Sequence, residues 1–292
     1  MRYSLENSAL HVEIDTHGAE IKSIRDIAED REYMWQADPA YWGRTSPVLF
    51  PFVGSLKNKE FIYEGVHYPM GQHGFARDME FALESQSDRS VWFALRANDD
   101  TRARYPFDFV LRIGYELSER TVTVLWEVQN PGKSDLHFSI GAHPAFLCPI
   151  HGEADKSGYR LYFGEEVDEI HHHGNDVASG MAFREDITLA LTNHRAVITP
   201  DFFDRCTYMI EGGQTNTVGL EDTDGSRIVT LHFDTPLFAI WSPEGKNAPF
   251  LCIEPWYGRC DAEDFDGTLE EREYSNRLAP DGVFHASYSM SF

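Results

Sequence analysis

The sequence predicts an all-β protein, built as a large antiparallel sandwich or barrel. Apolar and polar residues alternate with a period of two along most of the chain, and turn-forming residues separate the alternating stretches. Almost no stretch has a helical pattern. Many short strands with few helices are typical of antiparallel sheets that pack face to face or close into a barrel.

Each expected strand is an alternating or strongly apolar stretch. The clearest is Thr121–Val128, in which Val122, Val124, Trp126 and Val128 share one face. In chain order, the expected strands are Leu10–Ile14, Ser90–Ala97, Phe107–Leu117, Thr121–Val128, Leu136–Ile140, Ala196–Thr199, Arg227–Phe233, Phe250–Glu254 and Phe284–Phe292. Turn signals between them include Asn130–Lys133, Glu211–Gly213 and Thr223–Ser226.

One stretch, Leu269–Arg277, is a helix candidate, because Thr268 and Glu271 have the spacing of a capping box. No linker rich in Pro or Ser, low-complexity tract or internal repeat interrupts the chain. We therefore expect a single domain over residues 1–292.

The charge of the chain argues against two classes of binding partner, nucleic acid and membranes. The formal net charge is −23, from 25 Lys and Arg against 48 Asp and Glu, which disfavours nucleic acid and anionic membranes as partners. The start of the chain has no apolar signal segment, and no run of about 18 apolar residues occurs. We expect a cytoplasmic protein that does not bind membranes.

The sequence has no recognisable metal motif. Cys148, Cys206, Cys252 and Cys260 form no C-x-x-C pair, so free thiols are expected. Three adjacent histidines, His171–His173, alternate faces on a strand and do not converge on one ion. The acidic tract Asp261–Glu273 lacks the spacing of a calcium loop. We expect no metal and no other cofactor.

Titratable residues gather in three segments at the ends of expected strands: Gly71–Asp78, Ile140–Phe146 and Cys252–Asp261. Taken singly, His73 could end a turn, His143 could be a structural histidine, and Glu254 could pair with Arg259. Together they supply two imidazoles and a carboxylate, a set suited to acid–base catalysis near neutral pH.

The same segments carry a resemblance to a known family. They read H-G-F-A-R at 73–77, G-A-H-P-A-F at 141–146 and C-I-E-P-W-Y-G at 252–258. R-T-S-P-V-L-F-P at 44–51 and W-S-P-E-G-K at 241–246 add to them. In this order they resemble the aldose 1-epimerase (galactose mutarotase-like) superfamily, most closely its LacX-like branch, over nearly the whole chain. The resemblance implies a large antiparallel β-super-sandwich whose concave face holds a sugar.

The resemblance also implies roles. His143 matches the catalytic acid, Glu254 the catalytic base, and His73 a second active-site histidine. Arg44 matches an arginine that contacts substrate, and Arg77 one that binds phosphate in sugar-phosphate members of the family. The family often has a further aspartate, to which Asp204 gives only an ambiguous match.

Three tryptophans are candidates for the sugar face: Trp42, Trp241 and Trp256. We expect core packing for at least two of them. Trp256 is the preferred candidate, because it follows Glu254 by two residues.

The resulting hypothesis is an aldose 1-epimerase, or mutarotase, that acts on a free hexose. Glu254 as a carboxylate would take the proton of the anomeric hydroxyl, and protonated His143 would protonate the ring oxygen. This chemistry needs no electron sink or Lewis acid. If His143 must be protonated and Glu254 ionised, the rate should fall on both sides of neutral pH.

Three alternatives stay open. A hexose-6-phosphate mutarotase would use Arg44 and Arg77, with or without Arg259, as a phosphate clamp, although the net charge argues against it. A non-catalytic carbohydrate-binding or sensing protein could keep the fold. A glycoside hydrolase would need a second acid, which no comparable motif supplies. Both a monomer and a homodimer fit the sequence.

Overall fold

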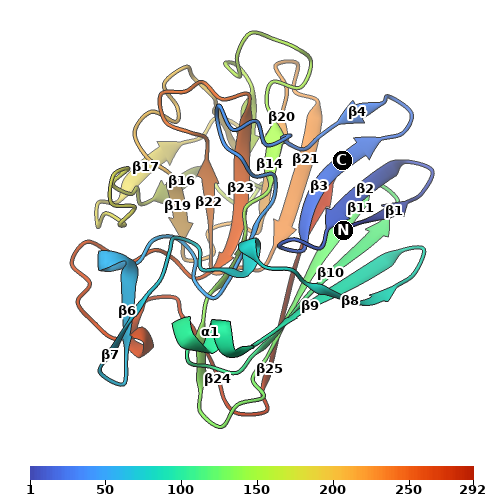
Figure 1. Cartoon of the computed structure of the whole chain (residues 1–292). Helices are drawn as coiled ribbons and strands as arrows, with labels where there is room; N and C mark the ends of the chain where they lie inside the picture. The colour runs from blue at the N-terminus through green and yellow to red at the C-terminus, as the bar shows by residue number, and fades with distance from the viewer.

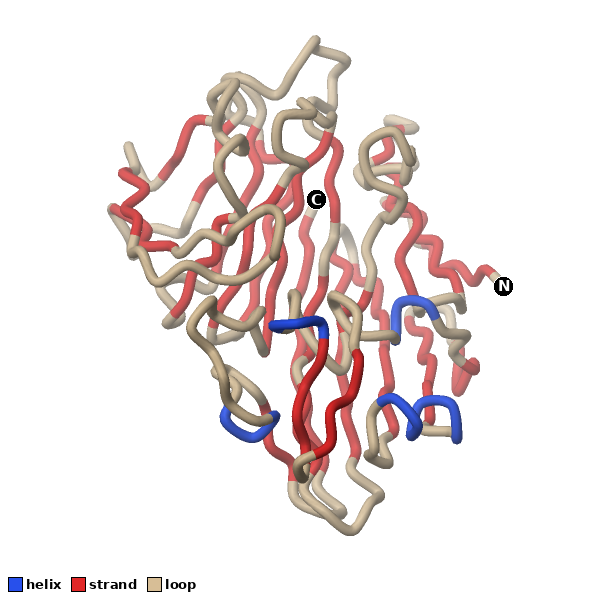
Figure 2. The backbone as a smooth tube through the Cα atoms, turned by 60° about the vertical axis from the view of Figure 1, so that its left-hand side comes forward, coloured by secondary structure: helices blue, strands red, loops and turns tan.

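A computed structural model describes residues 1–292 and contains 25 strands, one short α-helix and three turns of 3₁₀-helix (Figure 1). The predicted all-β architecture is confirmed. Every ladder between named strands is antiparallel, and the few helical turns lie on segments that connect strands (Figure 2).

Two large sheets form the body of the molecule. The order in the nine-stranded sheet is β18 (Arg195–Val197), β15 (Arg160–Tyr162), β20 (Thr217–Glu221), β21 (Arg227–Phe233), β25 (Val283–Ser291), β11 (Thr121–Gln129), β10 (Val110–Ser118), β9 (Ser90–Arg96) and β8 (Ala82–Gln86). The order in the six-stranded sheet is β19 (Tyr208–Glu211), β22 (Leu237–Trp241), β23 (Phe250–Tyr257), β13 (Ile140–Ala142) and β5 (Val48–Leu49), and β14 (Ala145–Leu147) also pairs with β23.

Smaller sheets complete the architecture. A four-stranded sheet has the order β1 (Arg2–Glu6), β2 (Leu10–Asp15), β3 (Glu20–Asp26) and β4 (Arg31–Glu32). Three two-stranded sheets pair β6 (Glu60–Tyr63) with β7 (Val66–Pro69), β12 (Leu136–Phe138) with β24 (Asn276–Leu278), and β16 (Glu169–His172) with β17 (Ile187–Ala190).

The hydrophobic core lies between the two large sheets. Along β11, the residues facing the core are buried and the others are partly exposed, as the period of two requires. Aromatic rings join the layers: Trp126 lies 6.3 Å from Tyr257, and Phe233 lies 5.1 Å from Phe238, between ring centroids. This packing fixes the position of the six-stranded sheet.

The side chains of strand β23 point alternately to the two faces of its sheet. Leu251 and Ile253 belong to the main core, whereas Glu254 and Trp256 line a pocket on the opposite face. The strand is buried on both faces, which explains why its sequence is almost continuously apolar apart from Glu254.

The predicted helix Leu269–Arg277 is wrong. The capping box of Thr268 and Glu271 forms, but it starts only a 3₁₀ turn, Leu269–Glu271. Arg272 is extended, at φ −64° and ψ 133°, because its guanidinium is buried in an ion pair with Asp261. This tertiary contact overrides the local helical signal.

One helix was not predicted from the sequence. Helix α1 (Asp99–Arg104) begins at Asn98, whose side chain accepts a hydrogen bond from the backbone N–H of Thr101. Its six residues bury only Thr101, so no apolar periodicity marks it in the sequence.

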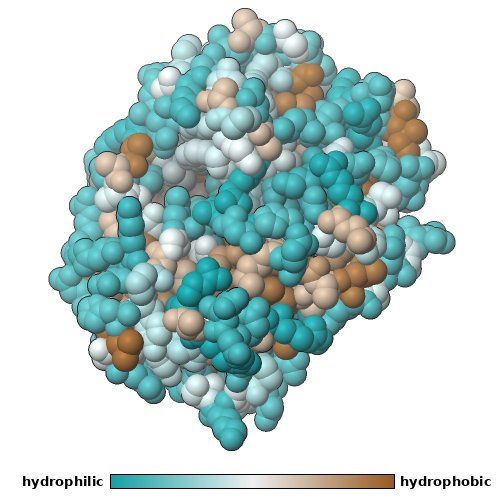
Figure 3. Space-filling model, viewed as in Figure 1, coloured by the Kyte–Doolittle hydropathy of each residue, from teal (hydrophilic) through white to brown (hydrophobic).

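None of the helices has the length and apolar character that a membrane span requires. The face of the molecule seen in Figure 3 is mostly hydrophilic, with apolar residues exposed in scattered patches.

Candidate active site

The register of the six-stranded sheet brings His143 and Glu254 together. Gly141 of β13 pairs with Trp256, and Ala145 of β14 pairs with Cys252, both on β23. Continuing this register across the gap between β13 and β14 puts His143 opposite Glu254. The gap contains Pro144, which cannot donate to a ladder, so the strand is interrupted where the imidazole projects.

The two side chains form a close, buried pair. His143 Nε2 lies 3.3 Å from Glu254 Oε2, and the two residues are 6% and 1% exposed. Burial lowers the pKa of His143 to about 3, and the nearby Arg77 adds to this shift. Burial also raises the pKa of Glu254 well above its usual value, and the Trp256 indole opposes this shift, although its Nε1 makes no well-aligned hydrogen bond.

These shifts favour a neutral imidazole beside a protonated carboxyl. The residue types alone predict the opposite state, an imidazolium beside a carboxylate. The physical reason for the difference is that desolvation penalises the charged form of both groups. Both states hold one exchangeable proton between the two groups, whose Nε2 and Oε2 atoms lie 3.3 Å apart without forming a hydrogen bond.

His73 lies beside this pair as a neutral hydrogen-bond donor. Its ring centroid is 5.6 Å from that of His143. Its Nδ1 accepts a hydrogen bond of 3.0 Å from the backbone N–H of Gly54, so the ring proton of the neutral form is on Nε2. Burial and the nearby Arg77 lower the pKa of His73 well below its usual value.

A tight backbone contact holds His73 in place. His73 has a φ of 64°, and its backbone N–H donates to Gly54 O at 2.9 Å. Gly54 has a φ of +74°, and a Cβ at this position would lie 2.5 Å from Cys260 Cβ. Only glycine therefore allows the chain segments of Gly54, His73 and Cys260 to meet here.

Aromatic side chains surround His143. Trp42 stacks on its ring at 4.6 Å and 27°, and Trp241 meets the ring edge-on at 5.3 Å and 85°. All three candidate tryptophans line the pocket, including Trp256. Trp256, the preferred candidate for the sugar face, is the most buried of the three at 4% exposed. Trp42 and Trp241 are partly exposed.

The two predicted arginines lie at one side of the pocket. Arg77 lines it and donates from Nη2 to Gln72 O at 2.7 Å, while its buried Nε makes no hydrogen bond. Arg44 does not line the pocket but pairs with Asp78, with Nη2 2.8 Å from Oδ1. Burial, and then the neighbouring Arg44, lower the pKa of Arg77 to about 10.

The pocket is open and has a volume of about 620 Å³, within the usual range for small-molecule sites. Sequence reasoning missed much of its wall, which comes from segments without a motif. The missed lining residues include Lys59, Asn175, Val177, Ala178, Ser179, Gly180, Thr207 and Met209. Only the long-range packing of these loops reveals them.

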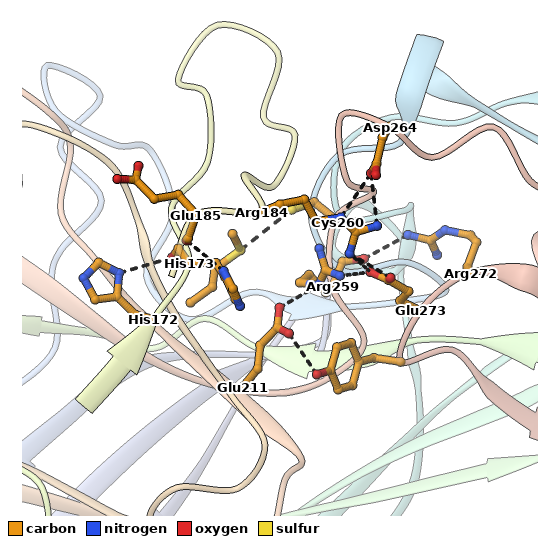
Figure 4. Close-up of polar contacts among 12 residues, drawn as sticks. His172, His173, Arg184, Glu185, Glu211, Arg259, Cys260, Asp264, Arg272 and Glu273 are labelled. Carbon is orange, nitrogen blue, oxygen red and sulfur yellow. Dashed lines mark hydrogen bonds and ion pairs between the residues drawn. The ribbon is translucent and has the colours of Figure 1, made fainter. Parts of the chain in front are cut away.

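Ion pairs brace the wall of the pocket behind Cys260 (Figure 4). Arg259, 4% exposed, pairs with Glu273 and with Glu211, whose Oε1 lies 2.7 Å from Arg259 Nε. Cys260 Sγ contacts Met209 Sδ at 3.7 Å. Arg259 thus fastens the end of β23 to β19, and the suggested pairing of Arg259 with Glu254 is wrong.

Other residues considered in the sequence lie outside the pocket. Asp204 accepts a hydrogen bond from Gly245 N at 3.2 Å and does not line it. His171 is exposed and His172 is buried, as alternation on β16 requires. Asp261, in the acidic tract, is buried and pairs with Arg272.

Comparisons with known proteins agree on one family. The family model for aldose 1-epimerase matches residues 1–263. The plasmid-encoded protein LacX of Lactococcus lactis is 30% identical over 299 residues, covering 100% of this chain and 99% of the relative. The chromosomal LacX of the same organism matches equally well.

Solved structures give the same result. A galactose mutarotase related enzyme from Lactobacillus acidophilus is 34% identical, with a TM-score of 0.93 and coverage of 100% of this chain and 97% of that chain. A galactose mutarotase-like protein from Lactobacillus casei is 27% identical, with a TM-score of 0.92 and coverage of 100% and 99%.

Proposed function

The chain belongs to the aldose 1-epimerase family, and from this premise we propose that it is a mutarotase, which interconverts the α and β anomers of a free hexose. The observation that carries the proposal is the pair of His143 Nε2 and Glu254 Oε2, 3.3 Å apart, in the wall of an open pocket. A base and an acid at this spacing can serve two adjacent oxygens of one sugar ring.

The pair holds the same number of protons before and after ring opening, because it gains one proton from the sugar and returns one to it. Transfer of the shared proton from Glu254 to His143 gives a carboxylate and an imidazolium. The carboxylate takes the proton of the anomeric hydroxyl, the imidazolium protonates the ring oxygen, and the bond between C1 and the ring oxygen breaks. The product is the open-chain aldehyde, and the pair returns to its neutral tautomer.

Ring closure reverses these steps on the other face of C1. Rotation about the C1–C2 bond presents the opposite face of the aldehyde to the sugar hydroxyl. His143 then takes the proton of that hydroxyl while Glu254 protonates the new anomeric oxygen. Since each positioned acid or base contributes about 10²–10⁴-fold, the two together are sufficient for a reaction that already proceeds in water.

The neighbouring side chains hold the sugar and the imidazole. His73 donates from Nε2 to a sugar oxygen, since Gly54 occupies its Nδ1. Trp42 and Trp241 fix the orientation of the His143 ring and offer apolar surface to a pyranose. Arg77 donates to sugar hydroxyls from the side of the pocket.

Polarimetry of freshly dissolved α-glucose and α-galactose tests the proposal. The wild-type protein should accelerate the approach to anomeric equilibrium, and His143→Asn should lose most of this activity. His172→Asn is the matched control, because His172 is also a buried histidine but lies outside the pocket. A wild-type protein that binds hexose without changing the rate would instead be a non-catalytic sugar-binding protein.

A second candidate, a hexose-6-phosphate mutarotase, is favoured by one observation. The buried Nε of Arg77 has no hydrogen-bond partner, and a second guanidinium, that of Arg44, lies close enough to lower the pKa of Arg77. The Asp78 carboxylate offsets part of this repulsion, at 2.8 Å from Arg44 Nη2 and 3.9 Å from Arg77 Nε, and an anionic group on the substrate would offset more of it. Anomerisation of glucose 6-phosphate faster than that of glucose, with the preference lost in Arg77→Gln, would establish this candidate.

A further inference from the structure

Cys252 lies next to the acid–base pair on the same face of β23. It precedes Glu254 by two residues, so both side chains leave the strand on one side. One potential ligand atom from each of His143, Cys252 and Glu254 lies within 4.8 Å of the other two. All three residues are buried.

This cluster has the composition of a site for a soft divalent cation. Imidazole, thiolate and carboxylate are the ligands that Zn²⁺ takes in proteins, at about 2.0–2.3 Å, which separates ligand atoms of a tetrahedral set by roughly 3.3–3.8 Å. Ligand atoms within 4.8 Å of one another can therefore reach one ion with side-chain movements of about 1 Å.

One polar atom of the cluster is free to bind. Glu254 Oε2 is buried without a hydrogen-bond partner and lies 3.3 Å from His143 Nε2. The pocket is open at His143 and Glu254, so an ion can enter from solvent and meet these two ligands before Cys252. The fourth position of a tetrahedral ion would face the pocket.

Charge balance is favourable when the thiol and the carboxyl release their protons to solvent. One Zn²⁺ with one thiolate, one carboxylate and a neutral imidazole has no net charge, which a buried site tolerates. A carboxylate and an imidazole alone would leave a positive charge beside Arg77. The thiolate is therefore the ligand that makes the site neutral.

We propose that Cys252, His143 and Glu254 form a three-ligand site for Zn²⁺ and similar soft divalent cations. The site uses one residue, Cys252, outside the proposed reaction. Its ligands are far apart in the sequence, which explains why no metal motif was recognisable there.

Co²⁺ is the probe for the site. Titration of the wild-type protein should produce a saturable thiolate-to-cobalt charge-transfer band at one equivalent. In Cys252→Ser the band should vanish, and Co²⁺ should bind at least about 10-fold more weakly. Cys260→Ser is the matched control, because Cys260 is also a buried cysteine beside the pocket, and it should keep the band.

X-ray absorption of the wild-type protein with Zn²⁺ makes the test independent of variant folding. One sulfur at about 2.3 Å, with nitrogen or oxygen at about 2.0 Å, is expected. Absence of sulfur, no saturable cobalt band, or a band that survives in Cys252→Ser would overturn the proposal. Because these readouts do not require turnover, they succeed or fail independently of the mutarotase proposal.

Discussion

The central feature at the scale of residues is a carboxyl buried so deeply that it holds its proton. Glu254 is 1% exposed, and burial raises its pKa well above the usual value. An isolated charge at this position would be costly, but one shared proton lets the pair with His143 stay neutral overall. Holding this proton lowers the free energy of unfolding at neutral pH, because Glu254 ionises freely in the unfolded chain and not in the folded protein.

Glu254→Gln should be more stable than the wild-type protein, by a margin that grows with pH. Above pH 4.5 the unfolded chain releases the Glu254 proton while the folded protein keeps it, so the contribution of Glu254 to wild-type stability falls as pH rises toward its folded-state pKa. The variant lacks this loss, which amounts to about 1.4 kcal/mol per pH unit within that interval. Urea unfolding at several pH values measures the difference, and a margin independent of pH would contradict the burial argument.

His73 should remain neutral, with its ring proton on Nε2, throughout the physiological pH range. The Gly54 N–H can only donate, so Nδ1 must accept, and burial keeps the pKa of His73 low. Nitrogen-15 NMR of the imidazole should show an unprotonated Nδ1 that does not titrate near pH 6.5. A titration at that pH would show that His73 is solvated and that its tautomer is not fixed.

At the scale of elements, β13 and β23 approach closely enough to require glycine at Gly141. A Cβ at this position would lie 2.6 Å from Cδ1 of Trp256 and 3.2 Å from Cγ2 of Val53. We expect Gly141→Ala to cost about 1–3 kcal/mol and to shift the tryptophan fluorescence, because Trp256 must move. Gly43→Ala is the control, since a Cβ there meets nothing within 4 Å, and equal effects of the two would contradict this packing.

The buried ion pairs of Arg259 provide a second test at this scale. Arg259→Ala removes the partner of the half-buried Glu211 carboxylate, whereas the more exposed Glu273 keeps its pair with Arg184, and should cost about 1–3 kcal/mol. Arg184→Ala, which removes pairs of a guanidinium that is 54% exposed, should cost less than about 1 kcal/mol. Thermal unfolding compares the two, and similar losses would contradict the role given to Arg259.

Elements with a clear period of two could be predicted from the sequence, and those defined by tertiary contacts could not. The expected strand Arg227–Phe233 is β21 without change, and Thr121–Val128 differs from β11 by one residue. In contrast, Arg272 ends the expected helix at its 3₁₀ turn through a buried ion pair with a distant carboxylate. Local pattern cannot reveal such a partner.

The residues of the candidate site also fall into those that the sequence predicts and those that only the fold reveals. Short motifs identified His73, His143 and Glu254, which the structure brings into one pocket. The loop residues Asn175 and Val177–Gly180 have no motif and reach the pocket only through the packing of the fold. The protonation states of His143 and Glu254 could not be predicted either, because they depend on how deeply the two side chains are buried.

At the scale of the whole molecule, we infer that the chain is one cooperative domain. A single cluster of 60 buried residues extends from Leu5 to Met290 and includes residues of both large sheets. Thermal unfolding should therefore give one transition, with equal calorimetric and van't Hoff enthalpies. Two separate transitions would show that the sheets belong to independent units.

The measurement that tests the central claim most directly is NMR exchange spectroscopy of an equilibrated hexose, in which cross-peaks between the α and β anomeric protons report interconversion. The wild-type protein should produce strong exchange peaks. His143→Asn and Glu254→Gln, each still folded, should reduce the exchange rate by at least about 10²-fold. Wild-type exchange no faster than in buffer, or unchanged exchange in both variants, would contradict the claim that this pair moves the proton.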